Sequence, residues 1–268
     1  MLNIEKTDIH GWEAAIRGAR NSFNSWDKSD SEPQYMCMDD KHRCPDGPYR
    51  IGPNDLSLMK KLAKAGPSHA KYRRFITVTM DVTGPLYWWK EMDTYKVGTV
   101  GNSCSTMHKI ADKKFEFSDF SWEHLDTFRG HSMYVPNEYH FSSKDLLDLE
   151  IQVLNQCREK YLKYKNKLDW WQMIQLLPSS YNQKRTLLVN YEVLANIYHQ
   201  RKGHKLDEWK TFCEWIEGLP MSEIITGISY EPDSNTIEKV SERFEKLGEG
   251  YTVSPEELKN LMKGDSND

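Results

Sequence analysis

The stretch FITVTMDV, residues 75–82, alternates apolar and polar side chains along its length. Its apolar members at every second position are Ile76, Val78, Met80 and Val82. A period of two is typical of a β-strand with one buried face. Gly84 and Pro85 end the pattern, and proline favours the first turn of a helix. The sequence therefore predicts a strand over 75–83 followed by a helix from Pro85.

Apolar residues at helical spacing surround this strand on both sides. They predict helices over 8–23, 54–65, 142–165, about 186–202 and 206–217. Ser142 and Asp145 have the spacing of a capping box at the start of the 142–165 helix. With one strand pattern among many helices, the expected fold class is α+β, with a single sheet and surrounding helices.

Composition limits the class of protein. The chain has 268 residues, 38% hydrophobic and 28% charged, with a net charge of −4. Interspersed charges of both signs give no nucleic-acid footprint, and no apolar run reaches the roughly 20 residues that span a bilayer. The N-terminus shows no signal peptide, and five cysteines, an odd number, argue against a disulfide framework. We expect a soluble cytoplasmic protein that binds neither nucleic acid nor membrane.

Two regions stand apart from the periodic segments. Residues 27–50 are rich in Asp, Ser, Pro and Lys without periodicity, which is typical of a surface insertion. The end of the chain is polar, so we expect a main domain at 1–225 and a polar extension at 226–268. Adjacent tryptophans at 88–89 and 170–171 indicate core or subunit contacts.

Residues 95–108, YKVGTVGNSCSTMH, follow the predicted helix and carry mostly small or polar side chains. The segment lacks the lysine of a phosphate-binding loop. Cys104 and His108 could form a thiolate pair, although no orienting third group is visible. Cys37, His42 and Cys44 lack a suitably spaced fourth zinc ligand, so no metal site is expected.

Asn190, Leu194, Ile197 and Arg201 share one face of the predicted 186–202 helix. An arginine on an apolar face requires an anionic or strongly accepting partner. A structural salt bridge and a bound ligand both satisfy this requirement. We expect the ligand, with Arg201 pointing into the protein.

Four segments in order resemble the flavin-dependent thymidylate synthases. ARNSF at 19–23 is similar to the end of that family's first helix, and GPSHAKYRRF at 66–75 to the segment before its strand. The segment after Pro85 has the spacing of the family's RHRxxSxNExSxRY signature. LLPSSYNQKRTLLVNYEVLANIYHQRKGHKLDEW at 176–209 resembles LPxxxYTxxxxTxNxRxLxxFLxLRxxxxAQxEI, without a gap from Leu177 to Arg201.

The signature itself is degenerate. Thr94, Tyr95 and Lys96 stand where the family has RHR, and Glu91 where it has a glutamine. The serine that contacts the nucleotide aligns with Cys104. The family's phosphate-holding arginine aligns with Thr106, and a further phosphate-facing arginine with Ile174. The arginine two residues after the helix asparagine aligns with Glu192. Loss of these charge-assisted contacts should weaken a nucleotide held in the family's manner.

The resemblance implies a flavin-dependent enzyme that transfers a methyl or hydroxymethyl group to a pyrimidine deoxynucleotide such as dUMP. It implies FAD, with methylenetetrahydrofolate and NADPH as co-substrates, and a homotetramer with active sites at subunit interfaces. The implied catalytic residue is Arg201, facing the pyrimidine. The implied substrate contacts are Glu91, Asn102, Ser103, Cys104, Ser105 and Arg201. The implied cofactor contacts are Ser22, His69, Lys96, Asn190, Asn196 and His204. The alternative is a fold relative without catalysis that serves as a nucleotide-binding or scaffold protein.

Overall fold

The computed structural model describes residues 2–33, 49–127, 133–135 and 139–227. The chain divides into two compact units. The first consists of Met1–Trp12 and Arg73–Leu219, and the second of Glu13–Tyr72 and Pro220–Asp268. Residues 228–268 of the expected extension and most of the expected insertion at 27–50 lie outside the described residues, so the predicted domain boundaries stay a prediction.

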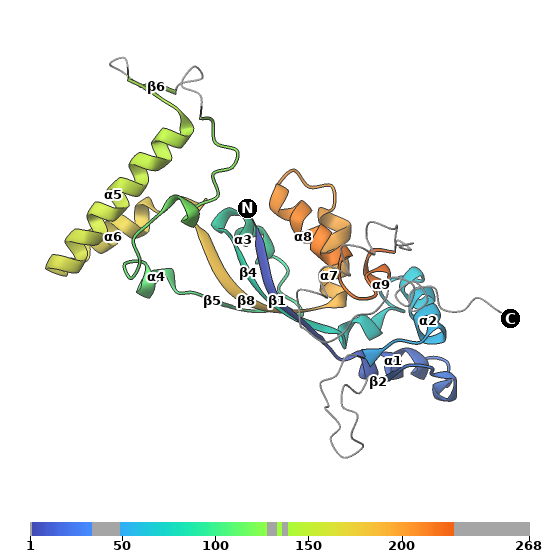
Figure 1. The fold of residues 1–268 in the computed structure, drawn as a ribbon. Helices are drawn as coiled ribbons and strands as arrows, with labels where there is room; N and C mark the ends of the chain where they lie inside the picture. Colours follow the sequence, from blue (N-terminus) through green and yellow to red (C-terminus); the bar gives the residue numbers. More distant parts are fainter. Residues whose placement is uncertain (1, 34–48, 128–132, 136–138, 228–268) are drawn as a thin grey trace, which may run out of the picture. The chain divides into compact units, whose positions relative to one another are not determined.

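The first unit is built on a four-stranded antiparallel sheet in the order β1-β4-β8-β5 (Figure 1). Its strands are β1 (Asn3–His10), β4 (Thr77–Pro85), β8 (Asn182–Asn190) and β5 (Val100–Ser103). The strand predicted over 75–83 is β4, which lies inside the sheet between β1 and β8. Val78, Met80 and Val82 are at most 1% exposed, so the predicted alternation is confirmed.

The described residues also form two short ribbons, one in each unit. β2 (Glu32–Pro33) pairs with β3 (Tyr49–Arg50), and β6 (Met133–Val135) pairs with β7 (Tyr139–Phe141). The expected α+β class with a main sheet and surrounding helices is confirmed.

A tryptophan-rich core lies in the first unit. α3 (Leu86–Met92) follows β4 with Pro85 as its N-cap, and α7 (Tyr191–Arg201) follows β8. Trp88 of α3 contacts Trp209 and Phe212 of α8 (Asp207–Glu217), with ring centroids 5.1 and 5.7 Å apart. These three side chains are fully buried, so the core reading of the first tryptophan pair is confirmed.

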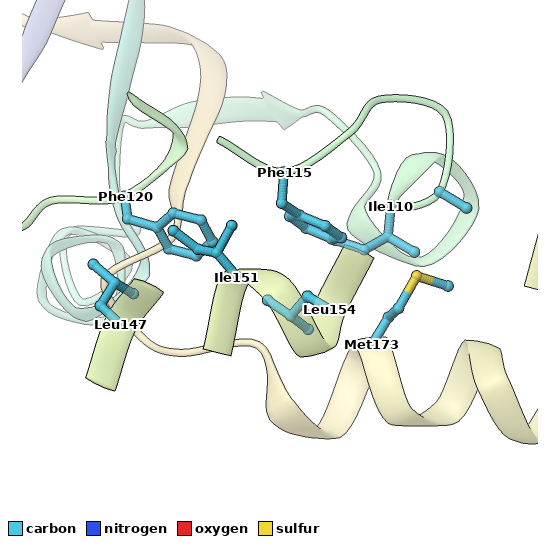
Figure 2. Packing of buried hydrophobic residues seen from close by; sticks show 8 residues of the cluster. Ile110, Phe115, Phe120, Leu147, Ile151, Leu154 and Met173 are labelled. Carbon is cyan, nitrogen blue, oxygen red and sulfur yellow. The ribbon is translucent and has the colours of Figure 1, made fainter. Parts of the chain in front are cut away.

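A second apolar cluster joins α5 (Ser143–Tyr164) and α6 (Lys167–Leu176) to the segment after α4 (Thr106–Lys109), which includes the short helix η3 (Phe117–Asp119). Figure 2 shows Leu147, Ile151 and Leu154 of α5 facing Phe115, Phe120 and Met173. The capping box predicted at the start of α5 is present: Ser142 Oγ accepts from Asp145 N at 3.1 Å, and Asp145 Oδ2 accepts from Ser142 N at 3.0 Å.

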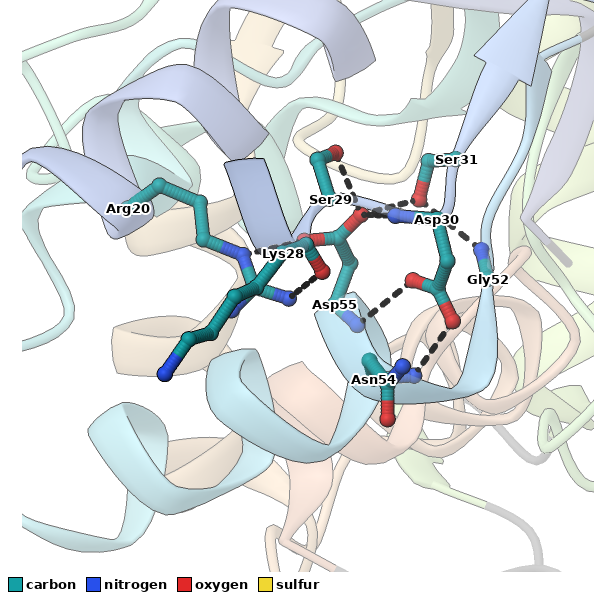
Figure 3. A network of polar contacts seen from close by, with 8 residues as sticks. All are labelled: Arg20, Lys28, Ser29, Asp30, Ser31, Gly52, Asn54 and Asp55. Atoms are coloured by element: carbon teal, nitrogen blue, oxygen red, sulfur yellow. Dashed lines mark hydrogen bonds and ion pairs between the residues drawn. The ribbon is translucent and has the colours of Figure 1, made fainter. Parts of the chain in front are cut away.

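The second unit holds most of α1 (Trp12–Asn21), η1 (Trp26–Lys28), α2 (Pro53–Lys64), part of η2 (Lys71–Arg74) and α9 (Glu223–Thr226). Its buried polar centre is Asp55, whose carboxylate accepts hydrogen bonds from Arg20, Ser29, Ser31 and the Asp30 amide (Figure 3). The Asp30 carboxylate in turn accepts from the amides of Asn54 and Asp55 at the start of α2. This network fixes residues 28–31 to α2.

Two predicted helices begin too early. The 8–23 helix begins at Trp12, because Asn3–His10 pair with β4 as an edge strand. The 186–202 helix begins at Tyr191, because Asn182–Asn190 pair with β4 on one side and partly with β5 on the other. Sheet pairing overrides the helical spacing in both places. Among the described residues, no helix has the length and apolar character needed to cross a bilayer.

Candidate functional site

The strand β8 continues into α7 with no intervening loop. Asn190 is the last residue of the strand and the N-cap of the helix, and its Oδ1 accepts a hydrogen bond from Val193 N at 3.0 Å. An asparagine at this position satisfies an amide that the first helical turn leaves unpaired. The junction fixes the direction of α7, and Arg201 ends that helix.

Arg201 is the centre of a polar cluster, which we call the Arg201 cluster: Arg201, Glu91, Tyr95, His204 and Trp209. Arg201 Nη1 donates to Glu91 Oε2 at 2.7 Å, and Nε donates to the Tyr95 hydroxyl at 2.9 Å. The guanidinium carbon lies 4.7 Å from the Trp209 ring centroid, within range of a cation–π contact. The Arg201 side chain is 19% exposed, so it points into the protein, as expected.

Two further groups converge on the same Glu91 oxygen. The indole of Trp209, which is fully buried, donates to Glu91 Oε2 at 2.8 Å. His204 Nε2 lies 3.6 Å from this oxygen. His204 Nδ1 accepts from the Leu206 amide at 3.2 Å, which leaves the ring proton on Nε2, the nitrogen facing Glu91. Glu91 is therefore held by hydrogen bonds from two different side chains, Arg201 and Trp209.

Arg201 has a protein partner, because the carboxylate of Glu91 accepts from its Nη1. The expected contact with a ligand stays a prediction. A glutamate at this position, in place of the family's glutamine, supplies the negative charge that the guanidinium needs. Within the described residues, Arg201 Nη2 has no hydrogen-bond partner, so one donor remains for a ligand.

A pocket of about 200 Å³ adjoins the cluster, between the end of α3 and the strands β5 and β8. We call it the α3–β5 pocket. It is lined by Met92, Asp93, Tyr95, Lys96, Thr99, Gly101, Ser103, Arg185 and Leu187. Tyr95 belongs to both structures, since its ring lines the pocket and its hydroxyl accepts from Arg201.

The predicted substrate residues at 102–105 lie on β5 and just after it. Of the four, Ser103 lines the α3–β5 pocket. Cys104 is exposed, and its backbone pairs with Lys184 and with the Gln183 side chain. Ser105 caps α4 by accepting from His108 N at 3.2 Å. No hydrogen bond joins Cys104 to His108, both of which the structure describes, so the geometry gives the thiolate-pair hypothesis no support.

The predicted cofactor residues are divided between the units. Lys96, Asn190, Asn196 and His204 lie in the first unit, and Ser22 and His69 in the second. Lys96, Asn196, Ser22 and His69 are exposed, and Asn190 and His204 partly so. The candidate zinc residues Cys37, His42 and Cys44 lie outside the described residues. Elsewhere in the described chain, no three His, Cys, Asp or Glu side chains gather as metal ligands.

The sheet, its helices and their order define the fold of the flavin-dependent thymidylate synthases. A Helicobacter pylori structure of this class, ThyX complexed with FAD and dUMP, matches 84% of this chain and 98% of its own, with a TM-score of 0.55 and 16% identity. The UMP/dUMP methylase PolB from Streptomyces cacaoi, bound with 5-Br dUMP, matches 85% and 96% with a TM-score of 0.53 and 14% identity. No protein-family model and no curated protein matches by sequence. The predicted resemblance is confirmed as a shared fold.

The loop before β5 fits the flavin that this fold implies, in the chemical type of its groups. Gly98 has φ of +82°, and a Cβ there would lie 2.8 Å from Asn190 Nδ2, so glycine lets the backbone approach this amide closely. Thr99 Oγ1 is buried without a hydrogen-bond partner among the described residues. Exposed Lys96 adds a positive charge. In their chemical type, these groups suit the phosphate or the polar edge of a bound nucleotide, a flavin nucleotide included.

Sequence reasoning missed Arg185, Asp93 and Trp209 as site residues. Arg185 and Leu187 share the pocket-facing side of β8, and this alternation was hidden because 186–190 was assigned to a helix. Trp209 lies in the predicted 206–217 helix, whose spacing gives no sign of the indole hydrogen bond to Glu91.

Proposed function

We propose that this chain is a flavin-dependent enzyme that transfers a methyl or hydroxymethyl group to carbon 5 of a pyrimidine nucleotide. The proposed substrates are dUMP or a related nucleotide, with methylenetetrahydrofolate and NADPH as co-substrates. One observation carries the proposal. Arg201 is held by Glu91 and Tyr95 beside an open pocket, in a fold whose solved examples hold dUMP or a bromo analogue of it.

Arg201 is the proposed catalytic residue. Its Nη2 would donate to a pyrimidine carbonyl and stabilise the negative charge that develops as carbon 5 becomes nucleophilic. Glu91 and Tyr95 fix the guanidinium plane, so the donor needs little reorganisation during the reaction. The bound FAD would supply the reducing hydride.

The other contacts remain proposals. Asn102, Ser103, Cys104 and Ser105 would line the nucleotide side of the site. Ser22, His69, Lys96, Asn190, Asn196 and His204 would contact the flavin.

A cytoplasmic homotetramer with shared sites is part of the proposal. Seven large apolar side chains of α5 and α6 are at least 39% exposed: Leu146, Leu149, Leu162, Tyr164, Leu168, Trp171 and Leu176. Exposed apolar side chains grouped on two packed helices suit a subunit contact. Light scattering at micromolar concentration tests this, and a stable monomer would contradict shared sites.

Tritium release from nucleotides labelled at carbon 5 tests the activity. The purified chain is incubated with FAD, NADPH, methylenetetrahydrofolate and labelled dUMP, UMP or dCMP, and its absorption spectrum is recorded with added FAD. We expect a flavin band and release of tritium from one nucleotide. A chain that binds a nucleotide but neither binds FAD nor releases tritium would instead be the non-catalytic nucleotide-binding or scaffold relative.

A further inference from the structure

Arg185 of β8 has an unusually fixed guanidinium. Its central carbon lies 4.2 Å from the ring centroid of Trp89, which is 1% exposed. Nε donates to Gln183 Oε1 at 2.9 Å and Nη1 to Asp93 Oδ1 at 2.7 Å. Stacking on a buried ring and two directed hydrogen bonds leave the group little freedom.

The residues behind Arg185 are themselves fixed. Gln183 Nε2 donates to the Cys104 carbonyl at 3.0 Å, so its Oε1 is the atom left to accept from Arg185. Arg185 Nη2 has no hydrogen-bond partner within the described residues, and the side chain remains 19% exposed at the α3–β5 pocket. A preorganised donor therefore faces the pocket.

The pocket has the chemistry of an anion site. Arg185 and Lys96 bring two positive charges and Asp93 one negative charge, which leaves an excess of one positive charge. The buried hydroxyl of Thr99, without a partner among the described residues, is a further donor, and Ser103 adds a second hydroxyl. A volume of about 200 Å³ is below the roughly 300–1,000 Å³ of sites that enclose a whole ligand. It suits a group of phosphate size at one end of a larger molecule.

We propose that the α3–β5 pocket binds the phosphate of a pyrimidine nucleoside monophosphate through Arg185. This inference rests on the proposed function for the base, which Arg201 would contact on the other side of Tyr95. Arg185 occupies a position that the family's sequence pattern leaves open, whereas Thr106 and Ile174 stand where that pattern has phosphate-holding arginines. The phosphate site would thus have moved to β8.

Calorimetric titration of the full chain with dUMP, deoxyuridine and inorganic phosphate tests the proposal. Arg185→Gln should weaken dUMP binding about 10- to 100-fold, the range for a charge-assisted contact. Deoxyuridine, which lacks the phosphate, should bind as it does to wild type. The matched control is Lys184→Gln, which removes the same charge one residue earlier and should leave both affinities unchanged. Its ammonium pairs with Glu5 and Asp81 and does not line the pocket.

Asp93→Asn shows whether Arg185 binds the phosphate of dUMP or only forms a structural ion pair with Asp93. Removing the competing carboxylate should tighten dUMP binding several-fold if Arg185 holds the phosphate. Unchanged dUMP affinity in both Arg185→Gln and Asp93→Asn would overturn the phosphate site and leave the proposed function intact. If wild type binds inorganic phosphate through Arg185 but binds none of dUMP, UMP and dCMP, the anion pocket is retained and the proposed function is refuted.

Discussion

Glu91 Oε2 lies 2.7 Å from Arg201 Nη1 and 2.8 Å from the indole nitrogen of Trp209. One carboxylate oxygen thus joins the end of α3 to the end of α7 and to the buried start of α8. The guanidinium that we propose as catalytic is also a structural link.

Glu91→Gln should lower stability and should also loosen Arg201. The ion pair is partly buried, so we expect a loss of about 1–2 kcal/mol, between the values for exposed and buried pairs. Urea unfolding measures the change. The matched control is Glu159→Gln, on an exposed carboxylate of α5 outside the cluster, and an equal loss in both variants would contradict a special role for Glu91.

Arg201→Lys should lower turnover about 10²- to 10³-fold, the scale for removing one stabiliser of developing oxyanion charge. The lysine ammonium can retain the contact with Glu91, but it lacks the second N–H edge that a guanidinium offers to a ligand. Tritium release and thermal unfolding are measured on the same variant. A large fall in melting temperature with normal turnover would make Arg201 a structural residue only.

Asp55→Asn should cost about 3–5 kcal/mol, because it leaves the buried guanidinium of Arg20 without its charged partner. Burial alone would raise the pKa of Asp55. Hydrogen bonds from Ser31, Ser29, Arg20 and the Asp30 amide outweigh burial and lower this pKa below 3.8. The carboxylate therefore contributes stability above about pH 4 that is lost as pH falls through the lower, folded-state pKa.

Thermal unfolding from pH 7 to pH 3 checks this pH dependence. The difference between wild type and Asp55→Asn should be constant above about pH 5 and shrink below pH 4. Asp112→Asn, on an exposed ion pair, should change stability by less than about 1 kcal/mol at any pH. A difference that grows on acidification would contradict the lowered pKa.

Leu154→Ala should destabilise the α5–α6 cluster by about 2.5–5 kcal/mol, because this side chain is fully buried among aromatic and apolar neighbours. Leu162→Ala, two turns later on the same helix and 40% exposed, is the control and should cost less than about 1 kcal/mol. Chemical denaturation compares them, and similar losses would contradict the packing in Figure 2.

Cysteine alkylation should distinguish Cys104 from Cys213. Burial, with Glu217 and Glu214 nearby, raises the pKa of Cys213 to about 11. At pH 8 only about one part in a thousand of that thiol is ionised. We expect peptide mass spectrometry to find rapid labelling at exposed Cys104 and almost none at Cys213. Cys104→Ser should remove the rapid label and keep turnover, and loss of turnover would revive the thiol mechanism.

The sequence predicted the elements whose apolar pattern is strong. β4 has one fully buried face, and α5 has both a capping box and a buried stripe, so pattern and structure agree. β1 could not be found this way because most of its side chains are exposed on an edge strand. Its pairing with β4 rests on backbone hydrogen bonds, and the periodicity of side chains carries no information about them.

The helical stripe from Asn190 to Arg201 was only partly correct. Leu194 and Ile197 are fully buried on α7, but Asn190 is the cap and not a member of the face. Residues 186–189 continued the helical spacing by coincidence, and only the pairing with β4 decides that they form a strand.

The site was predicted in part. Glu91 and Arg201 were both selected, from their places in the family pattern. Their mutual ion pair was not foreseen, because residues on two different helices give no spacing signal of contact. Asp93 and Arg185 were missed because a residue after a helix and a residue on a strand likewise give no spacing signal of contact.

Because β8 passes directly into α7, the number of residues in this segment determines the geometry of the site. One residue inserted after Asn190 would rotate the helix by about 100° and advance it by about 1.5 Å. Arg201 would then turn away from Glu91, while Arg185 would keep its place on Trp89. Such an insertion would change the orientation of the Arg201 guanidinium relative to that of Arg185 without removing either side chain. This segment can therefore exchange many of its side chains but cannot change its residue count.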